Sequence, residues 1–509
     1  MNKSYNDHMQ EISGSEIFEG FLGHGLFAEK IPQFLSSKSF YDFCTAQPTE
    51  ILFEKKEKQF IHYESMRNIN VPRILSIPDP IAYRNQCKVL ADNWPMLQDY
   101  FRDKTASHTH KYSRIHIRKI SNNDGFDFEK YLFEMNHKDF YEDDYPEPSL
   151  MIGKNFVVRA DISNCFPSIY THSIPWALMT KNYAKTHRQD SEWFNQIDIK
   201  TRNIKDAETH GILIGPHSSN LISEIVLVAV DQEMHRKGYE YIRNIDDYAY
   251  YAKTHENAET FLVELAAELK KFGLSLNHKK TEIAKLPLAS TEHWIRKLNT
   301  YTFVDENRPL KLNEIRAYLD IALDLMQRNK DNAAILNYVI KVLSAKDLTD
   351  NAKDYYIKTI HHLVLLYPYL IFLIEERLFD KFDIDPTYIK KIAQDIYAAG
   401  KEKLLFEAMS YAVYFGLKYD FSLGNNLIED AENHHDCIFR LLAYLHDKKF
   451  HSSPVNTRRY KNLAETLSAH EMDEFWVFCY EVLPKSKLTN YWKKMKESSL
   501  TFIRDGFGG

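Results

Sequence analysis

The stretch from Tyr241 to Tyr250 constrains the fold of this chain more than any other. Aromatic and β-branched residues lead to the adjacent aspartates Asp246 and Asp247, and further aromatic residues follow them. Alternation with a period of two on both sides predicts a β-hairpin with the two carboxylates at its tip. Neighbouring carboxylates repel each other, so their pairing favours a divalent cation site. A solvated turn is the alternative, because Asp is also a common turn residue.

Composition limits the classes of protein to consider. A length of 509 residues suggests about two to four domains. The net charge of −6 excludes a global basic field, so any contact with nucleic acid would be local. Five cysteines without CxxC spacing are typical of reduced thiols. Because neither a signal peptide nor a membrane-length apolar run is visible, we expect a soluble cytoplasmic protein without a membrane partner.

The elements around the hairpin predict an α+β fold. A buried strand over residues 156–160 ends at Asp161, and a later helix carries Pro216 in its first turn. A second helix ends before Gly273, and a strand follows it. The order strand, helix, strand, strand, helix, strand is that of a split βαβ sheet with helices on one face. In that topology the strand ending at Asp161 lies beside the hairpin, so carboxylates far apart in sequence can share metal ions.

Beyond about residue 305 the pattern changes. Apolar residues recur at helical spacing, as in Ile315, Leu319, Ala322 and Met326, and β-patterned runs nearly vanish. We therefore expect two domains, with residues 1–305 forming the α+β part. Residues 306–509 are predicted to be all-helical, and stacked helix pairs of a HEAT-like kind are compatible with them.

Five stretches resemble the motifs of reverse transcriptases and follow one another in the same order. They are the fingers motif Arg67–Pro78, the first catalytic motif Asp161–Tyr170, the glycine-bearing motif Gly211–Ser219 at the start of a helix, the catalytic hairpin Asn244–Asp247, and the GL-x-L-N-x-x-K-T motif Phe272–Thr281. Ordered matches on a compatible topology are more specific than any one motif. The resemblance implies a fingers and palm domain over residues 1–305.

Departures from the family's motif pattern indicate which branch of the family this chain resembles. Asn244 stands where templated members carry an aromatic residue, and Ile214 stands where they carry a glutamine that contacts the templating base pair. No thumb sequence is recognisable, and the helical residues 306–509 take its place. This combination resembles the Abi (abortive-infection) polymerases of bacterial phage defence, most closely the prophage-encoded type. The resemblance implies untemplated DNA synthesis, priming from a protein tyrosine, and a homo-oligomer, either trimer or hexamer.

The resemblance also implies the metal ligands and the acid. Asp161, Asp246 and Asp247 would hold two Mg²⁺ ions, with Mn²⁺ as a substitute, and the carbonyl of Ile162 would support them. Such ions compensate the charge that develops when a phosphoryl group is transferred. Lys280 would protonate the departing pyrophosphate. For Lys280 the alternative is a solvated lysine beside its neighbour.

Other residues would bind the incoming deoxynucleoside triphosphate. Arg67 and Arg73 would hold its β and γ phosphates, because guanidinium groups suit bidentate contacts to oxyanions. Phe166 matches the family's steric gate against a ribose hydroxyl, with a core phenylalanine as the alternative. Gly215 belongs to the nucleotide-binding motif at the helix start.

The primer and the mode of synthesis stay open at this point. The product would be single-stranded DNA attached covalently to a tyrosine, but sequence does not choose among the 32 tyrosines. Tyr5 and Tyr41 lie on the early segment, where a mobile primer could reach the palm. A templated RNA-dependent DNA polymerase is the first alternative. A degenerate palm that serves as a nucleic-acid-binding scaffold is the second, although a scaffold has no need to keep repelling carboxylates together.

Overall fold

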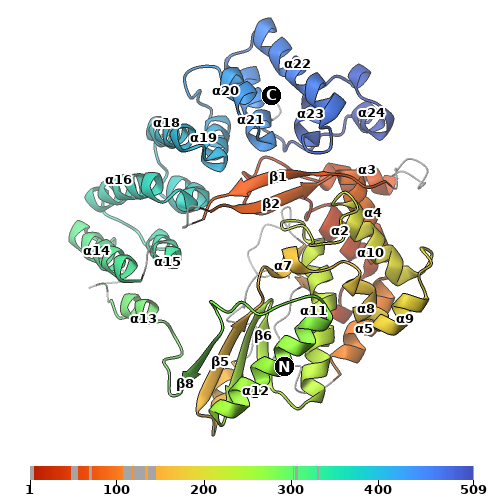
Figure 1. Cartoon of the computed structure of the whole chain (residues 1–509). Helices are drawn as coiled ribbons and strands as arrows, with labels where there is room; N and C mark the ends of the chain where they lie inside the picture. The colour runs from red at the N-terminus through yellow and green to blue at the C-terminus, as the bar shows by residue number, and fades with distance from the viewer. Residues whose placement is uncertain are drawn as a thin grey trace.

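The computed structural model describes two parts that pack against each other. It describes residues 5–46, 56–67, 71–106, 117–119, 132–135, 145–301, 303, 308–329 and 332–507. The α+β part comes first in the chain, and a helical part curves from α13 past α16 to α24 (Figure 1). This arrangement confirms the predicted fold class.

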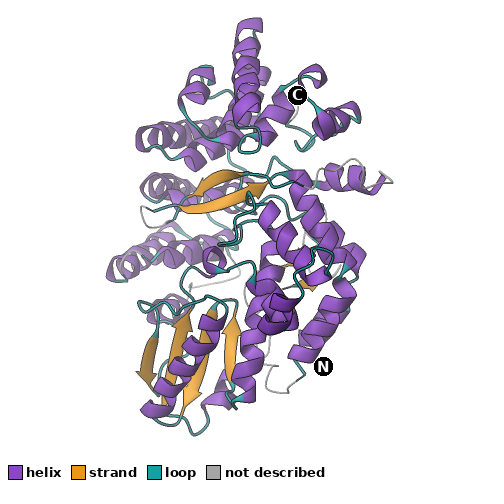
Figure 2. Ribbon diagram, turned by 45° about the vertical axis from the view of Figure 1, so that its right-hand side comes forward, coloured by secondary structure: helices purple, strands orange, loops and turns teal. Residues whose placement is uncertain are grey.

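The α+β part is built on a four-stranded antiparallel sheet. Its strands are β5 (Phe156–Asp161), β6 (Tyr241–Asn244), β7 (Asp247–Ala252) and β8 (Glu282–Lys285), in the order β6-β7-β5-β8. Helix α12 (His255–Lys271) packs on β5 and β7, and α11 (Ser218–Arg236) packs against α12 (Figure 2). The prediction that the strand ending at Asp161 lies beside the hairpin is confirmed, because β5 pairs with β7.

After the predicted domain, we call the four-stranded sheet with α11 and α12 the palm, and the hairpin near residues 60–78 with its neighbouring helices the fingers. Strands β1 (Phe60–Ser65) and β2 (Arg73–Pro78) pair antiparallel. Helix α4 follows β2 directly, and Asp79 caps it by accepting hydrogen bonds from two backbone amides of the first turn. The other elements before β6 are α1 (Tyr5–Gln10), α2 (Gly14–Leu22), α3 (Lys38–Ala46), α4 (Pro80–Asp92), α5 (Trp94–Lys104), β3 (Arg118–Lys119), β4 (Phe133–Glu134), α6 (Glu147–Met151), α7 (Cys165–Ser168), α8 (Ser173–Met179), α9 (Lys181–Thr186) and α10 (Trp193–Asn203).

The later part of the chain is helical, as the apolar spacing predicts. Consecutive helices pack in pairs, such as α14 with α15, α18 with α19, and α22 with α23. From residue 308 to residue 507 the described residues form helices and no β-strand. The helices are α13 (His293–Asn299), α14 (Leu312–Arg328), α15 (Ala333–Ser344), α16 (Asp350–Leu366), α17 (Ile371–Ile374), α18 (Pro386–Lys403), α19 (Phe406–Lys418), α20 (Ile428–Asn433), α21 (Cys437–Phe450), α22 (Pro454–His470), α23 (Trp476–Val482) and α24 (Asn490–Glu497). The domain boundary at residue 305 and the HEAT-like repeat stay predictions.

The helical part packs on the fingers hairpin. Helices α19 and α21 contact β1, and the hairpin lies beneath them in Figure 1. A carboxylate oxygen of Glu407 accepts a hydrogen bond from the backbone amide of Met66, just after β1. Near the other end, the Tyr491 hydroxyl donates to Asp79 at 3.0 Å. The helical part therefore packs directly on the fingers hairpin and stabilises it.

Two further features of the described residues are the lengths of the helices and the state of the cysteines. Every helix in the described ranges is too short or too polar to cross a lipid bilayer. All five cysteines are buried and carry free thiols. The thiols therefore pack as small apolar groups in the core.

Candidate active site

Three carboxylates gather at one corner of the sheet. Asp161 ends β5 and pairs in register with Asp247 at the start of β7. The backbone amide of Ile162 donates to the carbonyl of Asp246 at 3.1 Å, which ties the turn of the hairpin to the end of β5. The predicted order of strands and helices already placed these carboxylates near one another, and the register of β5 with β7 explains their contact.

The hairpin turn is strained. Asn244 pairs with Asp247, so Ile245 and Asp246 form a two-residue turn. Ile245 adopts a φ of +58°, in the left-handed region that a β-branched side chain rarely enters. Such a conformation costs about 1–3 kcal/mol and persists only where its surroundings enforce it. Arg243 helps to enforce it, because its Nη1 donates to the carbonyl of Ile245 at 3.0 Å.

A buried ion network anchors the hairpin to α11. The guanidinium of Arg243 lies 3.0 Å from Glu224 and 2.7 Å from Asp231, and all three side chains are buried. The hydroxyl of Tyr241 donates to Asp231 at 2.6 Å. Sequence reasoning missed this network. The signal that could have found it is the pair Glu224 and Asp231, two helical turns apart on either side of the apolar run Ile225–Val230.

The Phe272–Thr281 motif supplies two partners for Asp161. The side-chain amide of Asn277 donates to one carboxylate oxygen at 3.0 Å, and Lys280 Nζ donates to the other at 2.8 Å. The hydrogen bond to Asp161 raises the pKa of Lys280, so this amine is protonated. The structure places Lys280 against the carboxylates, while its role as the acid stays a prediction, and it adds Asn277, which the sequence did not assign.

The corner carries unbalanced negative charge. Burial, and then the charges of Asp246 and Asp161, raise the pKa of Asp247 to about 6. Burial also raises the pKa of Asp246, and Asp161 adds to the effect, whereas Lys280 and Arg73 oppose it. Carboxylates held together against their repulsion suit a cationic ligand.

The donor set fits Mg²⁺ by chemistry, but the present arrangement is not a closed metal cage. Carboxylate oxygens are the protein ligands that Mg²⁺ prefers. In the described part of the chain, no three His, Cys, Asp or Glu side chains converge closely enough to hold an ion as they stand. Instead the amine of Lys280 neutralises Asp161, and its side chain is 65% exposed and free to turn away. The carbonyl of Ile162 stays a predicted ligand.

Cations of the fingers face the carboxylates. Arg73, which pairs with Ser65 in the hairpin, interacts electrostatically with Asp246 and with Arg67. Burial and the charges of Arg73 and Arg67 lower the pKa of a third cation, Lys30. Among the described residues, no carboxylate lies within salt-bridge distance of these three cations. We call Lys30, Arg67 and Arg73 the cation cluster; the sequence predicted the two arginines and missed Lys30.

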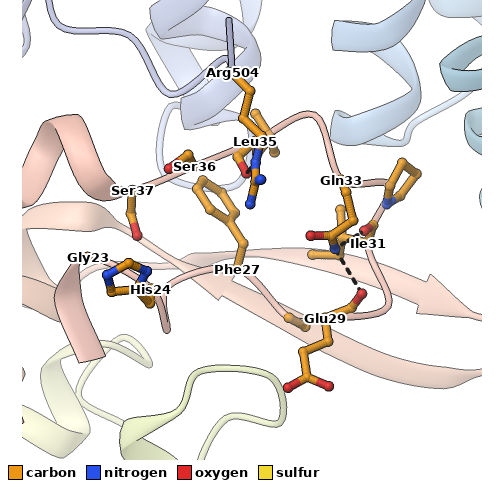
Figure 3. A pocket seen from close by; sticks show the side chains of 12 residues that line it. Gly23, His24, Phe27, Glu29, Ile31, Gln33, Leu35, Ser36, Ser37 and Arg504 are labelled. Atoms are coloured by element: carbon orange, nitrogen blue, oxygen red, sulfur yellow. Dashed lines mark hydrogen bonds between the residues drawn. The ribbon is translucent and has the colours of Figure 1, made fainter. Parts of the chain in front are cut away.

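The loop that carries Lys30 is held by the helical part. The hydroxyl of Tyr411 donates to the carbonyl of Lys30 at 2.9 Å, and the Lys30 amine lies 5.7 Å from the centre of the Phe372 ring. Arg504, near the C-terminus, donates from Nε to the carbonyl of Leu35 at 2.9 Å (Figure 3). The hollow beside this loop has a volume of only about 30 Å³, room for little more than water. This hollow is a small packing gap between the loop and the residues that hold it.

Glycines fit the palm closely to the fingers. Gly215 has a φ of +129°, and a Cβ there would lie 2.9 Å from the carbonyl oxygen of Ser76 in β2. The backbone amide of Ser76 donates to the carbonyl of Ile214 at 2.7 Å. A larger residue than glycine would push the two segments apart. The predicted contact of Gly215 with a nucleotide stays a prediction.

The structure places Phe166 and the two early tyrosines, Tyr5 and Tyr41, in different surroundings. Phe166 lies half-buried on α7, five residues after Asp161, and its role as a steric gate stays a prediction. The expectation of a mobile Tyr5 is wrong, because the side chain is 4% exposed and its hydroxyl donates to Glu224 at 2.6 Å. Tyr41 lies half-buried on α3, with the Lys38 amine 4.7 Å from its ring centre.

Comparison with known proteins places this geometry in a family. Residues 111–311 match the family described as reverse transcriptase (RNA-dependent DNA polymerase). This segment is a reverse-transcriptase domain. It contains the whole carboxylate corner and Lys280, whereas the cation cluster lies before it in the chain. The search of curated proteins finds no match.

Solved structures similar to this chain include yeast telomerases. Apo telomerase from Candida tropicalis, truncated from the C-terminal domain, is 13% identical, with a TM-score of 0.28, over 48% of this chain and 52% of that one. The chain therefore spans about half of that protein. Apo telomerase from the same organism is 11% identical, with a TM-score of 0.32, over 73% and 69%. Telomerase from Candida albicans with a TWJ fragment of telomeric RNA is 12% identical, with a TM-score of 0.28, over 92% and 71%.

Proposed function

We propose that the protein is a DNA polymerase of the reverse-transcriptase type that works without a template, primes on one of its own tyrosines, and acts in phage defence. The observation that supports polymerase activity is that carboxylates and cations face each other across the site. Asp161, Asp246 and Asp247 gather at one corner, and the cation cluster of the fingers faces them. A metal-bound triphosphate is the ligand that satisfies both sets of charges.

The reaction is an in-line displacement at the α-phosphorus of a deoxynucleoside triphosphate. The attacking hydroxyl oxygen forms a new P–O bond and gives up its proton, and the P–O bond to pyrophosphate breaks. Two divalent cations bound by the carboxylates would activate the hydroxyl and compensate the developing charge. The cation cluster holds the β and γ phosphates. Lys280, already protonated, donates its proton to the leaving pyrophosphate.

Two features support synthesis without a template. Ile214 presents an apolar side chain, packed against the core, where templated relatives use a glutamine to contact the base pair. The helical part contacts the end of the fingers hairpin through Glu407, and its Tyr411 holds the loop that carries Lys30. The helical part therefore lies against the fingers, on the side from which Tyr411 holds the loop with Lys30. Templated RNA-dependent synthesis is the second candidate, and the description of the matching family favours it.

One assay separates the candidates. Purified full-length protein is incubated with Mg²⁺ and labelled deoxynucleoside triphosphates, without nucleic acid, beside the matched variant Asp246→Asn. We expect label that stays on the polypeptide after denaturation and disappears in the variant. Label that requires a primer–template would instead establish templated synthesis. No label under either condition would leave a nucleic-acid-binding scaffold as the function.

The cellular role has its own test. Expression in a bacterial host is expected to lower the number of phage plaques, and Asp246→Asn is expected to restore it. The proposed place of action is the bacterial cytoplasm, and the proposed assembly is a trimer or hexamer. Mass photometry of the purified protein checks the assembly, and a monomer would contradict it.

A further inference from the structure

A second cavity lies outside the carboxylate corner. It is a partly open cleft lined mainly by residues of α8, α9 and α10 and has a volume of about 380 Å³. Cavities that bind small ligands commonly measure about 300–1,000 Å³. Nothing in the proposed polymerase chemistry uses this cavity.

Aromatic rings form one wall of the cavity. Tyr170 and Trp176 both line it, and their ring centres lie 5.7 Å apart. Both side chains are half-buried, so part of each ring remains accessible. The amine of Lys181 lies 4.1 Å from the centre of the Trp176 ring. Partly exposed rings beside cations are the usual platform on which nucleic-acid bases stack.

Cations also line the cavity. Lys185, Arg188 and Arg202 line the cavity, together with the carboxylates Asp190 and Asp198. Among the described residues, no carboxylate lies within salt-bridge distance of Lys185 or Arg188. Nε of Arg188 donates to the carbonyl of Lys185 at 2.8 Å, which leaves the rest of the guanidinium for a ligand.

The carboxylate at the floor of the cavity is already engaged. Asp198 is 4% exposed and accepts a hydrogen bond from Nδ1 of His172 at 2.6 Å. Its other oxygen lies 3.3 Å from Nε of Arg202. These contacts fix Arg202 at the floor, so the cavity presents more positive than negative charge to a ligand.

The cavity adjoins the catalytic motifs. Tyr170 closes the first catalytic motif and forms a β-bridge with His210, the residue before Gly211. Its Cβ lies 3.9 Å from the position a Cβ would take at Gly273. The cavity therefore lies next to the segment that carries the first catalytic motif, and Tyr170 belongs to both.

We propose that this cavity binds a nucleotide unit of single-stranded nucleic acid, with the base against Tyr170 and Trp176 and the phosphate held by Lys185, Arg188 and Arg202. The unit can come from a strand or from a free nucleotide, and both offer the same base and phosphate. Binding at this cavity does not depend on the proposed activity, since it can be measured with the catalytic carboxylates disabled.

The test is a binding titration in the full-length Asp246→Asn background. The probes are a fluorescein-labelled oligothymidylate and a labelled deoxythymidine triphosphate, each followed by fluorescence anisotropy at several salt concentrations. The test variant carries Lys185→Gln and Arg188→Gln. The matched control carries Lys493→Gln and Lys494→Gln, which remove the same charge from exposed positions of α24.

We expect the test variant to bind the oligonucleotide about tenfold more weakly than the control. Loss of two phosphate contacts should also make the slope of log K against log salt shallower by about 1.4. A third variant, Trp176→Leu, keeps both charges and is expected to weaken binding severalfold without changing the slope.

The two probes distinguish the sources. Weaker binding of the oligonucleotide alone assigns the cavity to a strand, and weaker binding of both probes assigns it to a single nucleotide unit. Equal binding by test and control variants overturns the proposal. It is also overturned if the unsubstituted cavity binds neither probe.

Discussion

Two charged clusters in the palm lie close together in sequence and differ in how their charges are balanced. Around Arg243, two buried carboxylates surround one guanidinium and a tyrosine hydroxyl adds a hydrogen bond. At the neighbouring corner, three carboxylates have Lys280 as their one contacting cation among the described residues. The first cluster keeps one surplus negative charge inside the core, where the hydroxyls of Tyr241 and Tyr5 donate to its carboxylates. The second cluster keeps a surplus of two at a corner where Asp246 and Asp247 are partly accessible. Charge that the fold leaves uncompensated and accessible marks the place where a ligand binds.

The largest effect should come from removing surplus charge. Asp246→Asn is expected to lower nucleotide incorporation at least about 10³-fold, because ligands to the developing charge contribute at this scale. The same change relieves repulsion, so thermal unfolding should occur at an equal or higher temperature. Incorporation assays and a melting curve on one preparation check both statements. A variant that loses activity because it unfolds would contradict the contrast between the clusters.

Removing compensated charge should have the opposite profile. Arg243→Met leaves Glu224 and Asp231 buried without their cation, which typically costs about 3–5 kcal/mol. The matched control is Arg159→Met, because Arg159 pairs with Glu282 at 2.8 Å where both side chains are 54% exposed. An exposed pair contributes at most about 1 kcal/mol. Chemical denaturation followed by circular dichroism measures the difference, and equal losses would show that burial does not separate the two.

Glu407 extends the comparison to the contact between the two parts of the chain. Burial raises its pKa from 4.5 to about 7, against the hydrogen bond from Met66. The folded state therefore holds a proton that the unfolded state releases, and stability falls as pH rises from about 4.5 to 7. Glu407→Gln keeps an acceptor without the charge and should remove this fall, worth about 3 kcal/mol at most. Melting temperatures of both proteins at pH 5 and pH 8 check this, and parallel curves would contradict it.

The smallest effect concerns Lys30, which has no carboxylate within salt-bridge distance among the described residues and is attracted only from further away by Glu407. Lys30→Gln is expected to raise the KM for deoxynucleoside triphosphates about tenfold, the scale of one charge-assisted hydrogen bond, with little change in kcat. Lys391→Gln, an exposed position on α18, serves as the charge-matched control. Steady-state incorporation kinetics measure both variants. A fall in kcat alone would assign Lys30 to the support of the fingers rather than to the phosphates.

The sequence by itself determined the sheet, the hairpin and the carboxylates. Alternation with a period of two and glycines at helix boundaries are local signals, and they placed Asp161, Asp246 and Asp247 at strand ends. The order of strands and helices then required β5 to lie beside the hairpin. Helical spacing in the later part of the chain is equally local, and it predicted the helices after residue 308.

Only the tertiary structure decided which charges are balanced. Whether Arg243 binds a ligand or two buried carboxylates depends on where α11 packs relative to β6, and the strand pattern carries no information about that packing. Lys30 reaches Arg67 and Arg73 because Tyr411, far along the chain, holds its backbone. Tyr5 is buried for a similar reason, since its hydroxyl meets Glu224 of α11. Such contacts between residues distant in sequence form only when the chain folds.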